Sequence, residues 1–263
     1  MHFTKMQGLG NDYLYVFGDV PENIIELCTH LSDRHFGAGS DGMIFISSSK
    51  VADFKMRIFN ADGSEAMMCG NGIRCVGKYV YEKGYTNKTG LKIETLSGIK
   101  SLDLHLAEGK VKSVSVDMGY AKVLDDIIVP LKNGEVLCLA ISMGNPHAVT
   151  FVEDVKKADV STIGPQIEHN KIFPGGVNVE FAEIISKNTI RMRVWERGSG
   201  VTLACGTGAC AAASAAVRKG LCGFDNPITV ILDGGTLEIT VHKDYKITMT
   251  GPAETVYEGD IVC

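Results

Sequence analysis

The sequence predicts an α+β fold of two similar β-rich domains, each wrapped around a central helix. Three observations predict it. A segment that reads as strand, glycine-rich turn and helix occurs twice, at a fixed offset of 136 residues from Cys69 to Cys205. Both copies carry Cys-Gly-x-Gly where the helix is expected to begin. Residues 91–118 and 228–250 are rich in β-branched residues and alternate in polarity, as strands do.

The repeat is clearest between residues 56–84, MRIFNADGSEAMMCGNGIRCVGKYVYEKG, and residues 192–220, MRVWERGSGVTLACGTGACAAASAAVRKG. Seven of the 29 aligned positions are identical, and the alignment needs no gap. Weaker matches pair KMQGLGNDYLYVF with ISMGNPHAVTFV, and LKIETLSGIKSLDLHL with ITVILDGGTLEITV. The period is far longer than the roughly 20–50 residues of a solenoid repeat, so it indicates two related domains.

These matches also predict the domain bounds. We expect a first domain over residues 1–117 that carries Cys69, and a second over 118–250 that carries Cys205. A final strand at about 251–263 is expected to return to the first domain. The active site is expected in the cleft between the two domains.

The elements around each Cys-Gly-x-Gly can be predicted in order. FKMRIF (54–59) and IRMRVW (190–195) alternate polar with apolar residues, as half-buried strands do. GIRCVGKYVYEKG and GACAAASAAVRKG both end in Lys-Gly, which is typical of the last turn of a helix and the glycine that follows it. The second of these is alanine-rich and nearly free of polar side chains, so it predicts a central buried helix.

Composition excludes several classes of protein. Of the 263 residues 45% are hydrophobic and 22% charged, as in an ordinary globular protein. A net charge of −5 argues against nucleic acid or an acidic membrane as a partner, since both select for basic surfaces. The chain shows neither a signal-peptide core nor a run of about 18 apolar residues, so we expect a cytoplasmic protein.

Cysteine usage agrees with that location. None of the eight cysteines forms a C-x-x-C pair, so the usual zinc and thioredoxin spacings are absent and no metal is expected. In the cytoplasm we expect reduced thiols, most of them small core residues. The cysteines are Cys28, Cys69, Cys75, Cys138, Cys205, Cys210, Cys222 and Cys263.

Cysteine and glycine at a helix start suit a particular chemistry. The first N–H groups of a helix are unpaired and carry partial positive charge, so we expect them to lower the pKa of each thiol and to bind a carboxylate. Two such starts facing one another would place Cys69 and Cys205 on opposite faces of one carbon. One thiolate would remove the α-proton and the opposite thiol would deliver another. The pattern therefore predicts cofactor-independent racemisation or epimerisation of an amino acid.

Five stretches together resemble the diaminopimelate epimerase family over nearly the whole chain. They are KMQGLGNDYLYV, FNADGSEAMMCGNGIRC, SMGNPHAV, GVNVEF and ERGSGVTLACGTGACA. The resemblance implies the duplicated fold and the interconversion of LL- and meso-2,6-diaminopimelate in lysine biosynthesis. It also implies that no cofactor takes part and that the protein is a homodimer.

The resemblance assigns site residues as well. It implies that Cys69 and Cys205 are catalytic and that His147 and Glu196 assist them. We expect Arg197 to pair with the distal carboxylate of the substrate and Glu196 with its distal ammonium group. The substrate-binding residues it implies are Asn11, Asn60, Gly70, Asn71, Asn145, Asn178, Glu196, Arg197, Gly206 and Thr207.

One position departs from the family pattern. Some members carry a substrate-contacting glutamine after the aspartate of the segment that matches GAGSDG, and Gly42 stands there in this chain. We expect that contact to be lost, or to be supplied by backbone or water.

Three other functions remain open at this stage. A racemase of another amino acid would keep both cysteines but would not need Glu196 and Arg197. A thiol redox enzyme would need the cysteine Cα atoms within about 7 Å and no carboxylate site. A non-catalytic binding protein would use the helix starts only to hold a carboxylate.

Overall fold

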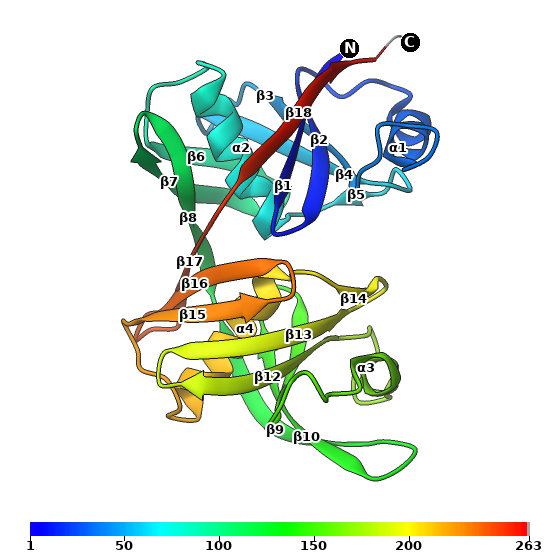
Figure 1. The fold of residues 1–263 in the computed structure, drawn as a ribbon, viewed down its shortest axis with the longest axis vertical. Coiled ribbons are helices and arrows are strands. Elements are labelled where there is room, and N and C mark those ends of the chain that lie inside the picture. Colours follow the sequence, from blue (N-terminus) through cyan, green and yellow to red (C-terminus); the bar gives the residue numbers. More distant parts are fainter. Residues whose placement is uncertain (262–263) are drawn as a thin grey trace. The chain divides into compact units, whose positions relative to one another are not determined.

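The computed structural model describes residues 1–261, so Cys263 lies outside the described residues. The chain divides into two compact units (Figure 1). Unit 1 comprises Met1–Val116 and Gly251–Cys263, and unit 2 comprises Asp117–Thr250. None of the helices in the described part of the chain is both long and apolar enough to cross a membrane.

Unit 1 is a mixed sheet with two helices. Its strand order is β18-β1-β2-β3-β4-β6-β7-β8, with the short β5 paired to β4. The β2–β3 and β4–β6 pairs are parallel, and the others are antiparallel. The elements are β1 (His2–Gly8), β2 (Asn11–Phe17), α1 (Ile24–Ser32), β3 (Gly42–Ser47), β4 (Phe54–Asn60), β5 (Glu65–Ala66), α2 (Gly70–Glu82), β6 (Gly90–Thr95), β7 (Gly98–Ala107), β8 (Lys110–Tyr120), whose last residues belong to unit 2, and β18 (Glu254–Asp260).

Unit 2 repeats this order. Its strands run β9-β10-β11-β12-β13-β15-β16-β17, with the short β14 paired to β13 and with β11–β12 and β13–β15 parallel. In this order β9 takes the place that β18, from the end of the chain, takes in unit 1. The elements are β9 (Lys122–Pro130), β10 (Glu135–Ser142), β11 (Pro146–Phe151), α3 (Val160–Glu168), β12 (Asn178–Ser186), β13 (Thr189–Glu196), β14 (Gly200–Thr202), α4 (Gly206–Arg218), β15 (Pro227–Leu232), β16 (Gly235–Val241) and β17 (Lys246–Gly251).

Each unit closes its sheet around one helix that begins directly after a repeated cysteine (Figure 1). Helix α2 is buried from Gly70 to Val80. Helix α4 contacts the strands from β9 to β13 together with β15 and β16, and its alanines are all buried. Small side chains let strands approach a helix closely on every side, which explains the alanine-rich sequence. The prediction of a central buried helix is therefore correct.

Most other cysteines are core residues. Cys28 packs with Leu31 of α1 against strands of unit 1, and Cys138 packs beside Val160 and Ile167 of α3 in unit 2. Burial raises the pKa of the Cys28 thiol to about 11 and that of the Cys138 thiol to about 12. These thiols stay protonated near neutral pH and behave as small apolar side chains.

The close fit around α4 leads to a stability prediction. Ala213 is fully buried in the middle of that helix. Ala213→Leu should lower the free energy of unfolding by about 1–3 kcal/mol, because the surrounding strands have no room for three more carbons. Arg218→Leu, at the exposed end of the same helix, should change it little. Denaturant unfolding of both variants checks this, and an unchanged midpoint for Ala213→Leu would show that the helix is loosely packed.

Candidate active site

Both repeated cysteines are the N-cap residues of the central helices. Cys69 precedes α2 with φ −131° and ψ 118°, and Cys205 precedes α4 with φ −113° and ψ 111°. Each sulfur accepts a hydrogen bond at 3.3 Å from the backbone N–H three residues later, that of Gly72 or Gly208. The sulfurs therefore lie at the positive ends of the helices, beside first-turn N–H groups that have no acceptor within their own helix.

The second glycine of each motif is required by what lies beneath it. A Cβ atom on Gly72 would lie 2.7 Å from Cδ1 of Ile44, and one on Gly208 would lie 2.7 Å from Oε1 of Glu180. A side chain at either position would push the strand below away from the helix start. The Cys-Gly-x-Gly spacing thus follows from a cysteine cap and a strand packed tightly under the first turn.

In unit 1 the cysteine contacts a predicted substrate-binding residue. The Cys69 thiol donates to Oδ1 of Asn11 at 3.2 Å, and Nδ2 of Asn11 donates to Oδ2 of Asp41 at 2.7 Å. A carboxylate only accepts, so the amide nitrogen must face Asp41 and the amide oxygen must face the sulfur. Burial and the neighbouring Cys69 raise the pKa of Tyr13, which therefore stays a neutral phenol beside this pair.

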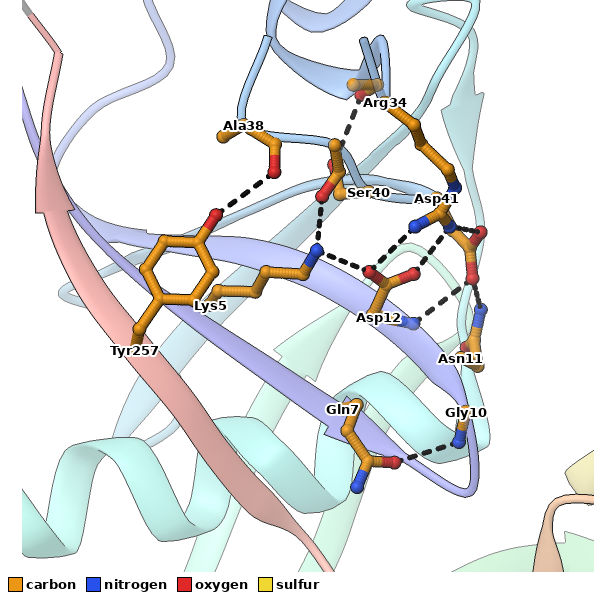
Figure 2. A network of polar contacts seen from close by, with 12 residues as sticks. Lys5, Gln7, Gly10, Asn11, Asp12, Arg34, Ala38, Ser40, Asp41 and Tyr257 are labelled. Carbon is orange, nitrogen blue, oxygen red and sulfur yellow. Dashed lines mark hydrogen bonds and ion pairs between the residues drawn. The ribbon is translucent and has the colours of Figure 1, made fainter.

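A charged network holds Asp41 in place, as Figure 2 shows. Arg34 donates to Oδ1 of Asp41 at 2.9 Å and to both oxygens of Asp12, which also pairs with Lys5 at 2.8 Å. Burial alone would raise the pKa of Asp12, but the hydrogen bonds from Arg34 and Lys5 outweigh it and lower that pKa. The sequence analysis did not identify Asp41 or Arg34. The aspartate beside Gly42 in GAGSDG was the available signal.

Two further predicted residues of unit 1 make local contacts. Asn60, at the end of β4, donates from Nδ2 to the Ser64 hydroxyl at 3.0 Å. Asn71 is buried, and its Oδ1 accepts from Nη2 of Arg74 at 3.0 Å, while Nη1 of Arg74 donates to the carbonyl of Gly70. Arg74 thus ties together the two residues with which α2 begins.

Gly42 lies opposite Asn60 in the β3–β4 pair, with a φ of 152° that glycine adopts readily. A Cβ atom there would overlap the carbonyl oxygen of Phe59. With this backbone no side chain fits, so the glutamine contact seen in some relatives is lost here.

In unit 2 the cysteine is surrounded by acidic groups. Cys205 is buried, and its sulfur lies 3.5 Å from Oγ1 of Thr207 and is hydrogen-bonded to Glu196. Glu196 also accepts from the Thr202 hydroxyl at 2.5 Å. Burial raises the pKa of Glu196 more than these hydrogen bonds lower it.

The expectation that the helix start lowers the pKa of this thiol is wrong for Cys205. Burial, followed by the carboxylates of Glu196 and Glu180, raises the pKa of Cys205 well above its usual value. The hydrogen bonds from Thr207 and from the N–H of Gly208 oppose this but are smaller. Cys205 is therefore a protonated thiol at neutral pH.

His147 reaches Cys205 only through other residues. Nδ1 of His147 lies 2.7 Å from Oε1 of Glu180, and Nε2 lies 3.1 Å from Oδ1 of Asn145. Nδ2 of Asn145 donates in turn to Oγ1 of Thr207 at 3.3 Å. The sequence analysis missed Glu180. A glutamate inside the apolar strand GVNVEF was the signal, since an ionised side chain is almost never fully buried unless it has a partner.

Glu196 and Arg197 turn to different partners. Whereas Glu196 faces Cys205, Nη1 of Arg197 donates to the carbonyl of Gly175 at 3.1 Å. The backbone N–H of Arg197 donates to Oδ1 of Asn178 at 3.0 Å, so Asn178 fixes the chain where β13 ends. Among residues 1–261, no cluster of three or more histidine, cysteine, aspartate or glutamate side chains is arranged to hold a metal ion.

Comparison with known proteins decides the family. The sequence profile of the family described as diaminopimelate epimerase matches residues 3–124 and 139–256. A diaminopimelate epimerase of Bacteroides thetaiotaomicron is 53% identical, over 98% of this chain and 97% of that protein. Those of Methanococcus maripaludis and Acetivibrio thermocellus are 52% and 49% identical, over 99% of this chain and 99% and 98% of theirs. This chain belongs to the diaminopimelate epimerase family.

Solved structures of other proteins share the fold. A hydroxyproline epimerase of Agrobacterium vitis superposes with a TM-score of 0.77 at 16% identity, over 98% of this chain and 91% of that one. A phenazine biosynthesis protein of the PhzF family from Bacillus anthracis gives 0.74 at 18% identity, over 100% and 99%. At such low identity these likenesses show the fold alone, and they confirm the predicted α+β duplicated architecture of the diaminopimelate epimerase family.

The electrostatics of Cys205 lead to a prediction. Glu196→Gln removes a negative charge that raises the pKa of Cys205, so the thiolate fraction at a given pH should rise. Alkylation of Cys205 by iodoacetamide at pH 8, followed by mass spectrometry of its peptide, should be several-fold faster than in the unmodified protein. Glu183→Gln, on the neighbouring strand, is the control, since its carboxylate accepts from the N–H of Val155. An equal or slower rate in Glu196→Gln would contradict the assigned cause.

Proposed function

We propose that this chain interconverts LL- and meso-2,6-diaminopimelate in lysine biosynthesis, without pyridoxal phosphate or another cofactor. One observation carries the proposal: in a member of the diaminopimelate epimerase family, two helices at matched positions begin at cysteines whose sulfurs cap them. By the same resemblance we expect a homodimer in the cytoplasm.

The reaction needs a base and an acid on opposite faces of one carbon. Because Cys205 rests as a thiol, we assign it as the acid and the thiolate of Cys69 as the base in the first turnover. Cys69 takes the α-proton, and Cys205 delivers its own proton to the opposite face. The product leaves with inverted configuration, and the enzyme holds Cys69 as thiol and Cys205 as thiolate. The reverse reaction, or proton exchange with water, restores the first state.

Removing an α-proton places negative charge on the adjacent carboxylate. The first-turn N–H groups of α2 and α4, at Gly70, Asn71, Gly206 and Thr207, are the groups we assign to stabilise that charge. This assignment requires both helix starts to reach one substrate carboxylate, which is the cleft arrangement expected from the repeat.

The remaining residues are assigned to substrate binding. Arg197 is the cation we assign to the distal carboxylate, with Asn178 holding its backbone. Glu196 lies at the Cys205 thiol, so the ammonium group it would neutralise is the one at the reacting carbon, and not the distal one that the sequence suggested. Asn11, Asn60 and Asn145 offer neutral donors and acceptors to the substrate.

The two cysteines provide the test of this mechanism. Cys69→Ala and Cys205→Ala should each lower kcat by at least about 10²- to 10⁴-fold, the usual contribution of one acid or base. Cys222→Ala, a buried cysteine outside both motifs, is the control and should keep near-normal activity. A coupled assay of the conversion of LL- to meso-diaminopimelate measures all three. Near-normal epimerisation by either active-site variant would exclude the two-base mechanism.

Substrate specificity supplies a separate prediction. Arg197→Met should lower kcat/KM for diaminopimelate by about 10- to 150-fold, the cost of one charge-assisted contact. Arg193→Met, which lies on the same strand and pairs with Asp233, should have little effect. Racemisation of lysine is measured in parallel. If the unmodified protein racemises lysine as fast as it epimerises diaminopimelate, the function is that of another amino-acid racemase.

A further inference from the structure

We propose that Glu180 is a positioning residue of the Cys205 half of the site and acts through His147. Glu180 sets the direction of a hydrogen-bond chain that ends with a donor at the Cys205 sulfur. The inference rests on the proposed function, because it gives Glu180 a part in the same reaction.

The first argument is the cost of burying this carboxylate. The side chains of Glu180 and His147 are both 0% exposed. Oε1 of Glu180 lies 2.7 Å from Nδ1 of His147, whereas Oε2 has no hydrogen-bond partner among residues 1–261. A buried carboxylate with an unsatisfied oxygen costs folding free energy that one ion pair seldom recovers. Stability alone therefore does not account for a glutamate at this position.

The second argument is that the other copy of the repeat has no carboxylate there. At the offset of 136 residues, Glu180 on β12 corresponds to Ile44 on β3, and both are fully buried beneath the second glycine of their motif. The strand registers agree, since Ile44 pairs with Tyr15 and Glu180 with Val149. The fold thus accepts an apolar side chain at this place, and only the Cys205 half carries a charge.

The third argument is where the contacts lead. A carboxylate only accepts, so Nδ1 of His147 carries a proton. Nε2 faces the amide oxygen of Asn145, so it carries a proton as well, and Glu180 balances the charge of the ring. Asn145 then has only its N–H to offer Thr207. The Thr207 hydroxyl, which accepts from Asn145, keeps its own hydrogen for the sulfur of Cys205 at 3.5 Å.

This direction matters at one moment in the reaction. When Cys205 gives up its proton the sulfur becomes a thiolate in a buried site next to Glu196. A donor from Thr207 and the N–H of Gly208 are then the contacts that stabilise it. Without the charge of Glu180, the ring of His147 holds one proton, the amide of Asn145 is free to turn over, and the Thr207 hydrogen is no longer directed at sulfur.

The experiment compares Glu180→Gln with Glu183→Gln, the same substitution three residues along β12 at a carboxylate that caps the N–H of Val155. In the full-length protein we expect Glu180→Gln to lower kcat/KM for diaminopimelate by about 10- to 100-fold, with its thermal midpoint unchanged or raised. In ¹⁵N spectra of the histidine rings, His147 should show two protonated nitrogens before the substitution and one after it. Glu183→Gln should alter neither the activity nor that signal.

Several outcomes would overturn the inference. Activity within twofold of normal in Glu180→Gln would do so, as would a His147 ring with a single proton in the unmodified protein. A fall in thermal midpoint that accounts for the lost activity would make Glu180 merely structural. If Glu180→Gln does not fold, Glu180→Ile, the residue of the matched position, replaces it with the same expectations. If the unmodified protein and Glu183→Gln both lack epimerase activity, the proposed function fails, and the ring signal still tests the role of Glu180.

Discussion

The contact on which the site depends is the hydrogen bond from a backbone N–H of the first helical turn to a cysteine sulfur, made once in each unit. It places a soft acid or base at the positive end of a helix. The helices α2 and α4 are buried on all sides by their own sheets, so neither start can shift without disturbing a core. The rigid centre of each unit therefore positions its reactive atom, and the tight strand beneath dictates the glycine at the third helical position.

Duplication supplies matched geometry, and unequal side chains supply the chemistry. The half with Cys69 has neutral amide and phenol groups near the sulfur, whereas the half with Cys205 has two carboxylates and a histidine. Inversion of a carbon centre needs two groups in mirror-like positions but with different protonation. The same backbone carries both, and the exchanged residues set the difference. The matched pairs, unit 1 first, are Tyr13 and His147, Ile44 and Glu180, and Asn60 and Glu196.

Local patterns in the sequence were enough to predict the repeat, the central helices and the cysteines at their starts, because each depends on neighbours within one or two turns of chain. The protonation of Cys205 was not predictable in this way. It depends on burial and on Glu196 and Glu180, which lie 9 and 25 residues earlier and meet the sulfur only when β12 and β13 pack under α4. Asp41 was missed for the same reason, since its contact with Asn11 spans 30 residues. Charge and burial are properties of the assembled site.

The central claim is that two groups, one on each face, carry separate protons. The most direct measurement is the conversion of LL-diaminopimelate in deuterium oxide, with both epimers recovered at low conversion and analysed by mass spectrometry. If Cys69 and Cys205 act as a pair, the meso product should carry one deuterium at the inverted carbon, whereas recovered LL substrate should still carry hydrogen. Equal deuterium in recovered substrate and product, or product that retains the substrate hydrogen, would mean that a single group serves both faces and would contradict the account.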